Sequence, residues 1–165
     1  MKRIRKQDRE MLSEMPKERL LDLFFLHIRN LWRVDGLYFL GIEGKFGTNV
    51  AMEIDSKCWR LMGKLEARSL KEVLGVEGDD ITSLMQVLRN TSWSLDQRNK
   101  EVEVSKTKGI FRVTECRTQE TRIHKGLREF PCKQVRFGYL KSFAEALNPK
   151  IEVACKVCPP DKHPP

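Results

Sequence analysis

The chain has 165 residues and a mass of 19.3 kDa, and 40% of its residues are hydrophobic. That is enough to bury one core and too little for two, so we expect a single domain over residues 1–165. The net charge of +8 permits nucleic acid as a partner, but 23 acidic residues dilute the basic ones, which makes a basic nucleic-acid-binding protein the weakest of the functions considered.

No stretch reaches the roughly 20 apolar residues that a membrane span needs, and the basic N-terminus has no apolar core or cleavage site behind it. We therefore expect a cytoplasmic protein without a membrane partner. In that compartment thiols stay reduced, so the five cysteines favour ligand, reactive or core roles over disulfides. The motifs typical of NTPases, serine hydrolases and zinc proteases (a glycine-rich phosphate loop, G-x-S-x-G and H-E-x-x-H) are missing.

The N-terminal part, residues 13–90, is expected to be helical after a flexible tail over residues 1–12. Apolar residues recur at helical spacing from Leu20 to Leu31 behind Pro16, and Asp35 with Gly36 is expected to interrupt them. The further helices expected are a short one through Leu37–Phe46 that ends at Gly47, a long one capped by Thr48 or Asn49 that ends at Gly75, and a fourth from Asp79 or Asp80 to about Leu88.

The C-terminal part, residues 91–165, changes character. Residues 91–100 are expected to be a polar connection, and alternating apolar residues on either side of Lys108 and Gly109 predict a β-hairpin. A last helix is expected over 132–147 and a closing strand over 151–155. The sequence therefore predicts an α+β fold in which N-terminal helices pack on a small antiparallel sheet with one C-terminal helix.

Three stretches carry a family resemblance that covers residues 12–163. They are HIRNLWRVDGLYFLGIEGKFGTNVAMEID with the later CWRLMGKLEAR, then FRVTECRTQETRIHKGLREFPCK, and finally CKVCPPDKHP. The chain resembles a family of uncharacterised prokaryotic proteins labelled "cytosolic protein", which is distantly similar to L-2-amino-thiazoline-4-carboxylic acid hydrolase. Its C-terminal half is more weakly similar to 4-vinyl reductase-type small-molecule-binding domains, whose late cysteines are associated with metal binding. Relatives continue past CPPD into a strand with another Cys and Trp, whereas this sequence stops at Pro165.

Four cysteines form the candidate metal site: Cys116, Cys132, Cys155 and Cys158. The C-x-x-C pair has the spacing at which two thiolates converge on one tetrahedral ion, and a closing strand beside the hairpin would bring all four together. We therefore expect zinc as a cofactor. The alternative is that these thiols are independent core or surface residues, a class to which we assign Cys58.

Reactive thiol chemistry is a second use of the same residues. Cys132 is expected at a helix N-terminus, where the dipole and nearby basic residues favour its thiolate. His124 lies between the motif cysteines and is a candidate base, or a nitrogen ligand that replaces one sulfur. A solvated loop histidine is the alternative for His124.

The helical half offers candidate pocket residues, which are polar or aromatic side chains set in apolar stripes: His27, Asp35, Glu43, Trp59 and Glu66. Each also has a purely structural interpretation, as a core residue or a partner in an ion pair. If they do line a pocket, the family resemblance implies a small-molecule ligand.

Three functions remain open from the sequence. The first is a zinc-stabilised small-molecule-binding module, the second a cysteine-dependent hydrolase that uses Cys132 and His124, and the third a nucleic-acid-binding protein. The first is preferred because four thiols lie in the C-terminal half, with a homodimer as a possible assembly. Whether the protein is an enzyme stays open.

Overall fold

The computed structural model describes residues 6–161. In that part of the chain it contains seven helices and one antiparallel sheet of two strands. The elements are, in chain order, α1 (Lys6–Ser13), α2 (Lys17–Phe46), α3 (Thr48–Val73), α4 (Ile81–Leu88), α5 (Ser92–Asp96), β1 (Asn99–Val104), β2 (Gly109–Glu115), α6 (Arg117–His124) and α7 (Lys133–Leu147). The predicted α+β class is confirmed.

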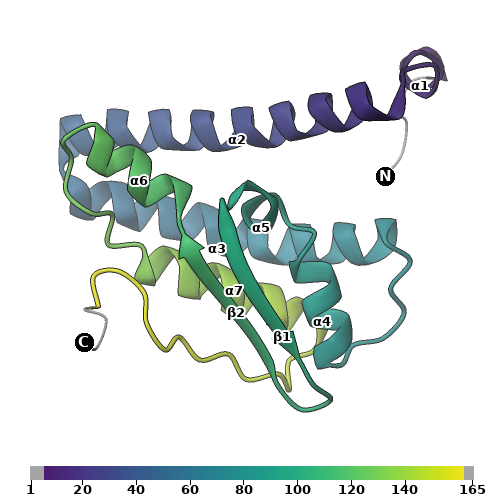
Figure 1. The fold of residues 1–165 in the computed structure, drawn as a ribbon. Helices are drawn as coiled ribbons and strands as arrows, with labels where there is room; N and C mark the ends of the chain where they lie inside the picture. Colours follow the sequence, from purple (N-terminus) through teal and green to yellow (C-terminus); the bar gives the residue numbers. More distant parts are fainter. Residues whose placement is uncertain (1–5, 162–165) are drawn as a thin grey trace.

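Two long helices form the frame of the molecule. Helices α2 and α3 run antiparallel as a hairpin, and α7 packs against α3 (Figure 1). The β1–β2 hairpin crosses this frame next to α4 and α5, with Val102 opposite Phe111 in its register. The core lies between these elements and is rich in aromatic side chains, among them Trp32, Trp59, Trp93, Tyr139 and Phe143.

Helix α2 differs from the prediction because Asp35 and Gly36 do not interrupt it. The Trp59 indole of α3 donates a hydrogen bond to Asp35 Oδ1 at 3.0 Å, which satisfies a polar side chain that sequence alone would place in a turn. A mid-helix glycine costs about 1 kcal/mol relative to alanine, and packing against α3 outweighs that cost. Gly47 ends the helix as expected, with φ of 85° and its N–H on the Glu43 carbonyl at 2.8 Å.

The C-terminal part holds more helix and less strand than expected. The connection expected over 91–100 contains α5, whose buried Trp93 joins the core, and α6 follows β2 directly. The closing strand expected over 151–155 does not form: this segment has no regular structure, although Ile151 and Val153 pack against the core. A run of three alternating apolar positions is too short to distinguish a strand from an extended segment that buries the same side chains.

Other boundaries agree with the sequence. Asp80 caps α4 by accepting a hydrogen bond from the Ser83 N–H at 2.8 Å, and α7 begins just after Cys132. Of the tail expected over 1–12, residues 6–12 belong to α1, which buries no side chain, and residues 1–5 lie outside the described part.

None of the helices within 6–161 has the length and apolar character to cross a bilayer.

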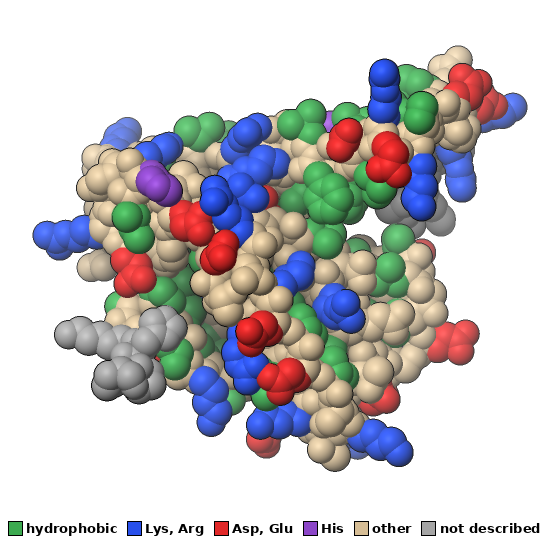
Figure 2. Space-filling view, viewed as in Figure 1, with side chains coloured by type: hydrophobic (Ala, Val, Ile, Leu, Met, Phe, Trp, Pro, Cys, Tyr) green, Lys and Arg blue, Asp and Glu red, His purple; other side chains and the backbone are tan. Residues whose placement is uncertain are grey.

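Charged side chains of both signs are interspersed over the face that carries the β-hairpin (Figure 2). A nucleic-acid interface is usually a basic patch or stripe, and the pattern on this face does not favour one.

The contact between α3 and α7 depends on Gly63. A Cβ at this position would lie 2.4 Å from Ser142 Oγ and 2.6 Å from the Tyr139 carbonyl oxygen of α7. We expect Gly63→Ala to lower the free energy of unfolding by about 2–3 kcal/mol, because the backbone of α7 has to move away.

Gly41→Ala in α2 is the matched control, since nothing lies within 4 Å of its added Cβ. That variant should gain about 0.5–1 kcal/mol from helix propensity. Urea denaturation followed by circular dichroism measures both, and equal stabilities of the two variants would contradict the close α3–α7 contact.

Candidate functional site

Two of the four predicted cysteines are in contact at the N-terminal end of α7. Cys132 immediately precedes this helix, and its Sγ lies 3.4 Å from the Sγ of Cys158 in the C-terminal segment. Cys116 immediately precedes α6, and Cys155 lies three residues before Cys158 in the same C-terminal segment. All four side chains are partly buried, whereas Cys58 on α3 is exposed. Cys58 therefore differs from the other four in its exposure.

Gln119 of α6 holds the segment that leads to Cys132. Its Nε2 donates to the Phe130 carbonyl at 2.7 Å, and its Oε1 accepts from the Phe130 N–H at 2.8 Å. The same Nε2 also lies 3.8 Å from the Cys132 Sγ, at the long limit for a hydrogen bond to sulfur. A buried amide thus fixes the backbone two residues before the thiol and places a donor beside it.

The C-terminal segment is held on the first turn of α7 by Lys133 and Asp161. The Lys133 Nζ lies 2.8 Å from Asp161 Oδ2, and its backbone N–H donates to the Pro159 carbonyl at 2.9 Å. Asp161 in turn accepts from the Cys158 N–H at 3.3 Å. Cys158 is therefore positioned against Cys132 by backbone as well as side-chain contacts.

The two thiols in contact have different acidities. The hydrogen bond from Cys158 lowers the pKa of the Cys132 thiol most, with further help from the Arg136 charge and the Gln119 amide, against the opposing effect of burial. The pKa of Cys158 is raised, because its proton is retained in that hydrogen bond and because the site is buried. Burial also raises the pKa of Cys116. Cys132 is thus the preferred thiolate of the cluster.

The cysteines do not form a ready-made metal cage. Within residues 6–161, no three Cys, His, Asp or Glu side chains are arranged closely enough to hold one ion. Cys116 is still near enough for the charge of Cys132 to raise its pKa, and the charge of Cys155 acts in the same way on Cys158. Two sulfurs are in contact, and two more lie within electrostatic range.

His124 does not contact the thiols. It is the exposed last residue of α6, and the hydrogen-bond partners of the Cys132 Sγ are Cys158 and Gln119 instead. The position is that of a solvated histidine. A role for it as the base of Cys132 stays a prediction that the geometry does not favour.

Arg136 connects the thiols to a buried aromatic cluster. It lies one turn after Cys132 on α7, and its guanidinium carbon is 4.5 Å from the Trp93 ring centroid and 5.6 Å from those of Trp32 and Trp59. The two latter rings stack on each other at 4.7 Å. The Arg136 Nη1 is buried without a hydrogen-bond partner in the described part, and four aromatic rings lie within 6 Å of the guanidinium carbon.

Two carboxyl groups, those of Asp35 and Asp55, lie within electrostatic range of this cation. Burial raises the pKa of Asp35. Burial, together with the neighbouring charge of Asp35, raises the pKa of Asp55 to about 7, and the positive charge of Arg136 limits both shifts. The single charge of Arg136 balances one carboxylate. The second therefore keeps its proton until near-neutral pH.

The remaining candidate pocket residues have separate environments. Trp59 belongs to the aromatic cluster, and Glu66 accepts hydrogen bonds from the Tyr139 hydroxyl at 2.8 Å and the Ser92 N–H at 3.0 Å. Glu43 instead forms a two-point ion pair with Arg122, with distances of 2.9 and 3.1 Å. His27 is exposed on α2. The structure thus brings Asp35, Trp59 and Glu66 to one buried cluster and leaves the other two apart.

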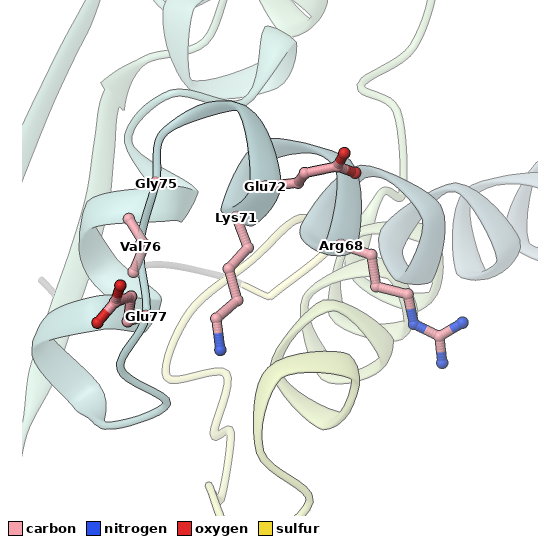
Figure 3. A pocket seen from close by; sticks show the side chains of 6 residues that line it. All are labelled: Arg68, Lys71, Glu72, Gly75, Val76 and Glu77. Atoms are coloured by element: carbon pink, nitrogen blue, oxygen red, sulfur yellow. The ribbon is translucent and has the colours of Figure 1, made fainter. Parts of the chain in front are cut away.

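The surface formed by residues 6–161 includes the following two cavities. One of about 400 Å³ lies where α3 ends, lined by Arg68, Lys71 and Glu72 of the helix and residues 75–77 of the turn (Figure 3). The other, of about 550 Å³, is lined by the Glu43–Arg122 pair, by residues 127–129 and by Pro131, which is the residue before Cys132. Its size is that of small-molecule sites, and it adjoins the thiols.

Sequence reasoning missed Gln119, Arg122 and Asp161 as parts of the site. Gln119 binds Phe130 11 positions away, Asp161 pairs with Lys133 28 positions away, and Arg122 pairs with Glu43 79 positions away. No periodicity or motif marks such pairs. Arg136 could be found, because an arginine four residues after a helix-initiating cysteine lies on the same side of the helix.

The raised pKa of Asp55 has a consequence for stability. The folded protein retains a proton up to about pH 7 that the unfolded carboxyl, with a pKa of 3.8, has already released. The free energy of unfolding should therefore fall as pH rises from about 4 to about 7 and stay level above that. Asp55→Asn should remove about 2–4 kcal/mol of this decline, as measured by urea denaturation between pH 5 and pH 8.

The same substitution at the exposed Asp22 serves as the control and should leave the pH dependence unchanged. If Asp55→Asn has the slope of the wild type, the proton resides elsewhere in the cluster.

The comparisons with known proteins add one finding. The model of a family of unknown function, DUF6125, matches residues 13–165. Neither the curated proteins nor the solved structures contain a match to the chain.

Proposed function

Because the chain belongs to DUF6125, a family of unknown function, we propose a function from its own site: a small-molecule-binding protein whose clustered cysteines hold a soft metal ion such as Zn²⁺. The contact between Cys132 and Cys158 carries this proposal. Thiolates are the preferred ligands of such ions in structural sites.

The sulfur separation supports shared coordination. Two sulfurs bound to one tetrahedral zinc, each at about 2.3 Å, are about 3.8 Å apart. The 3.4 Å between the Sγ atoms of Cys132 and Cys158 is close to this value, and it is reached without a disulfide between them. The lowered pKa of Cys132 favours the deprotonated form that a metal requires.

The further ligands would come from Cys116 and Cys155. Both are partly buried, and each is within electrostatic range of one member of the contacting pair. Each lies in a segment without regular structure, next to α6 or in the C-terminal segment, where a side chain can reorient. An ion held by these four would fasten α6, α7 and the C-terminal segment together.

The small-molecule site in this proposal is the cavity of about 550 Å³ beside Pro131. Its lining combines apolar Leu40 and Leu127 with charged Arg128 and the Glu43–Arg122 pair. Such a lining suits a small ligand with one polar end. The cysteine site would fix the segment that forms one wall of this cavity.

The metal site is tested by elemental analysis of protein purified without a histidine tag. We expect about one zinc per chain in the wild type and a loss of most of it in Cys132→Ser and in Cys158→Ser. Cys58→Ser is the matched control, because this exposed thiol lies on α3 and should not alter the metal content.

Two outcomes would overturn the metal site. One is a wild type without metal after purification in zinc-containing buffer. The other is zinc that persists in both site variants, which would place the ion elsewhere. Circular dichroism shows whether a variant that lost zinc is still folded.

A second function is favoured by the unequal acidity of the two thiols. Cys132 has the lowered pKa and Cys158 the raised one, which is the arrangement of a nucleophile with a proton-donating neighbour. In a cysteine-dependent hydrolase, the Cys132 thiolate would attack an electrophilic carbon of the substrate, and the bond from that carbon to the leaving group would break as the leaving group takes the proton of Cys158. Water would then add its hydroxyl to the same carbon and return a proton to Cys158, which releases the product and the Cys132 thiolate. In that case the cavity beside Pro131 would bind the substrate.

Alkylation separates this function from the first. In metal-free protein, iodoacetamide should modify Cys132 at a lower pH than it modifies a cysteine in an unstructured peptide, as followed residue by residue with mass spectrometry. Cys158→Ala should shift the Cys132 curve to higher pH, because it removes the hydrogen bond that most stabilises the thiolate. A Cys132 that reacts like the peptide thiol contradicts a nucleophilic role.

A further inference from the structure

The exposed apolar side chains concentrate on the two longest helices. Of the large hydrophobic residues that are exposed within the described part, most belong to α2 and α3. Isolated exposed leucines are normal for a protein surface, but contiguous apolar areas mark interaction sites. The question is therefore whether these residues share one face.

On α2 they follow a regular stripe. The apolar members are Leu20, Phe24, Leu31, Val34 and Tyr38, and the exposed His27 completes the spacing of 4, 3, 4, 3 and 4 residues. That is the 3.5-residue repeat of helices that pack side by side in bundles and coiled coils. The stripe contains no Lys, Arg, Asp or Glu.

On α3 a second stripe has the same repeat. It consists of Ile54, Cys58, Leu61 and Leu65, with spacings of 4, 3 and 4 residues. All four residues are exposed, and none is charged.

The two stripes lie on the same side of the hairpin. Each α3 stripe residue is two positions before a residue that faces α7 or is buried: Leu61 precedes Gly63 and Leu65 precedes Ala67. Two residues turn a helix by about 200°, so the α3 stripe points away from α7. In the same way, His27 lies two positions before Arg29, which reaches toward α5 to pair with Asp96 at 2.6 Å.

The two stripes form one face, because the rotation around the helix from the mutual contact to the stripe has the same sense on α2 and on α3. On both helices the stripe comes one residue, about 100°, before the residues of the mutual contact, as Leu31 does before Trp32 and Cys58 before Trp59. Because the helices are antiparallel, the same turn on each leads to the same side of the pair. We call this side, made of the two stripes, the outer face; by the same helical geometry it points away from α5 and α7.

We infer that the outer face is the contact surface of a homodimer, in which α2 and α3 pack against the same helices of a second copy. The eight large apolar side chains of the outer face are 39% to 72% exposed. At about 150–200 Å² of surface per large side chain, they present on the order of 700 Å², close to the roughly 800 Å² per partner of a stable interface.

A second copy fits this surface better than an unrelated partner. Two-fold pairing requires a face that complements itself, and uncharged stripes with a 3.5-residue repeat meet that requirement. The result is a four-helix arrangement of two hairpins, with the ion-paired and thiol-bearing sides turned outward. This inference does not depend on the proposed function, since no thiol of the site lies on the outer face.

Sedimentation velocity at micromolar concentration tests the dimer. Wild-type protein should sediment at twice the 19.3 kDa mass of the chain. Leu31→Glu combined with Leu61→Glu should raise the dissociation constant at least about 100-fold and give a monomer, because each interface would bury four unpaired charges. Leu37→Glu is the matched control: Leu37 is 64% exposed on α2, lies off the stripe, and should leave the dimer intact.

Three outcomes would overturn the inference. They are a monomeric wild type, a double variant that stays dimeric, and a control that dissociates as readily as the double variant. Far-ultraviolet circular dichroism excludes unfolding, and the single variants Leu31→Ala and Leu61→Ala provide a milder test if the charged pair fails to fold. A wild type that is monomeric but binds neutral phospholipid vesicles would assign the outer face to a lipid surface instead.

Discussion

The close approach of α3 and α7 at Gly63 is the constraint on which the rest of the structure depends. Without a side chain at that position, the Ser142 hydroxyl donates to the Arg60 carbonyl at 2.7 Å, and the two backbones come into near contact. This closeness brings Trp59 against Tyr139, with 5.7 Å between their ring centroids. It also determines where the N-terminal end of α7 lies, and therefore where Cys132 meets the C-terminal segment.

One partly buried cation, Arg136, links the core to the thiol site. Arg136 lies among aromatic rings; its charge limits the rise in the pKa of Asp35 and Asp55 and helps to lower the pKa of Cys132. Burying a charge costs free energy. The negative charge of the Asp35–Asp55 pair, in which one carboxyl group retains a proton, offsets part of that cost for Arg136. The same guanidinium charge therefore acts on the acid pair and on the Cys132 thiol.

Much of the helical half could be predicted from local sequence. Pro16, Gly47 and Asp80 mark helix ends through backbone geometry and capping, and these effects act within a few residues. The helix interruption predicted at Asp35 is wrong because the partner of this residue, Trp59, is 24 residues away. The hydrogen bond between them keeps a turn-forming side chain inside a helix. The helix α5 was missed because polar residues surround Trp93, whose burial depends on α7 and the β-hairpin.

The sequence by itself determined the α+β class and the β-hairpin around Lys108, because composition and alternation are local properties. Only the tertiary structure decided that Cys132 and Cys158 are the pair in contact, that Glu43 pairs with Arg122 rather than joining Asp35, and that the segment expected as a closing strand has no regular structure. These outcomes depend on distances between residues far apart in the chain, and such distances are set by packing rather than by sequence spacing.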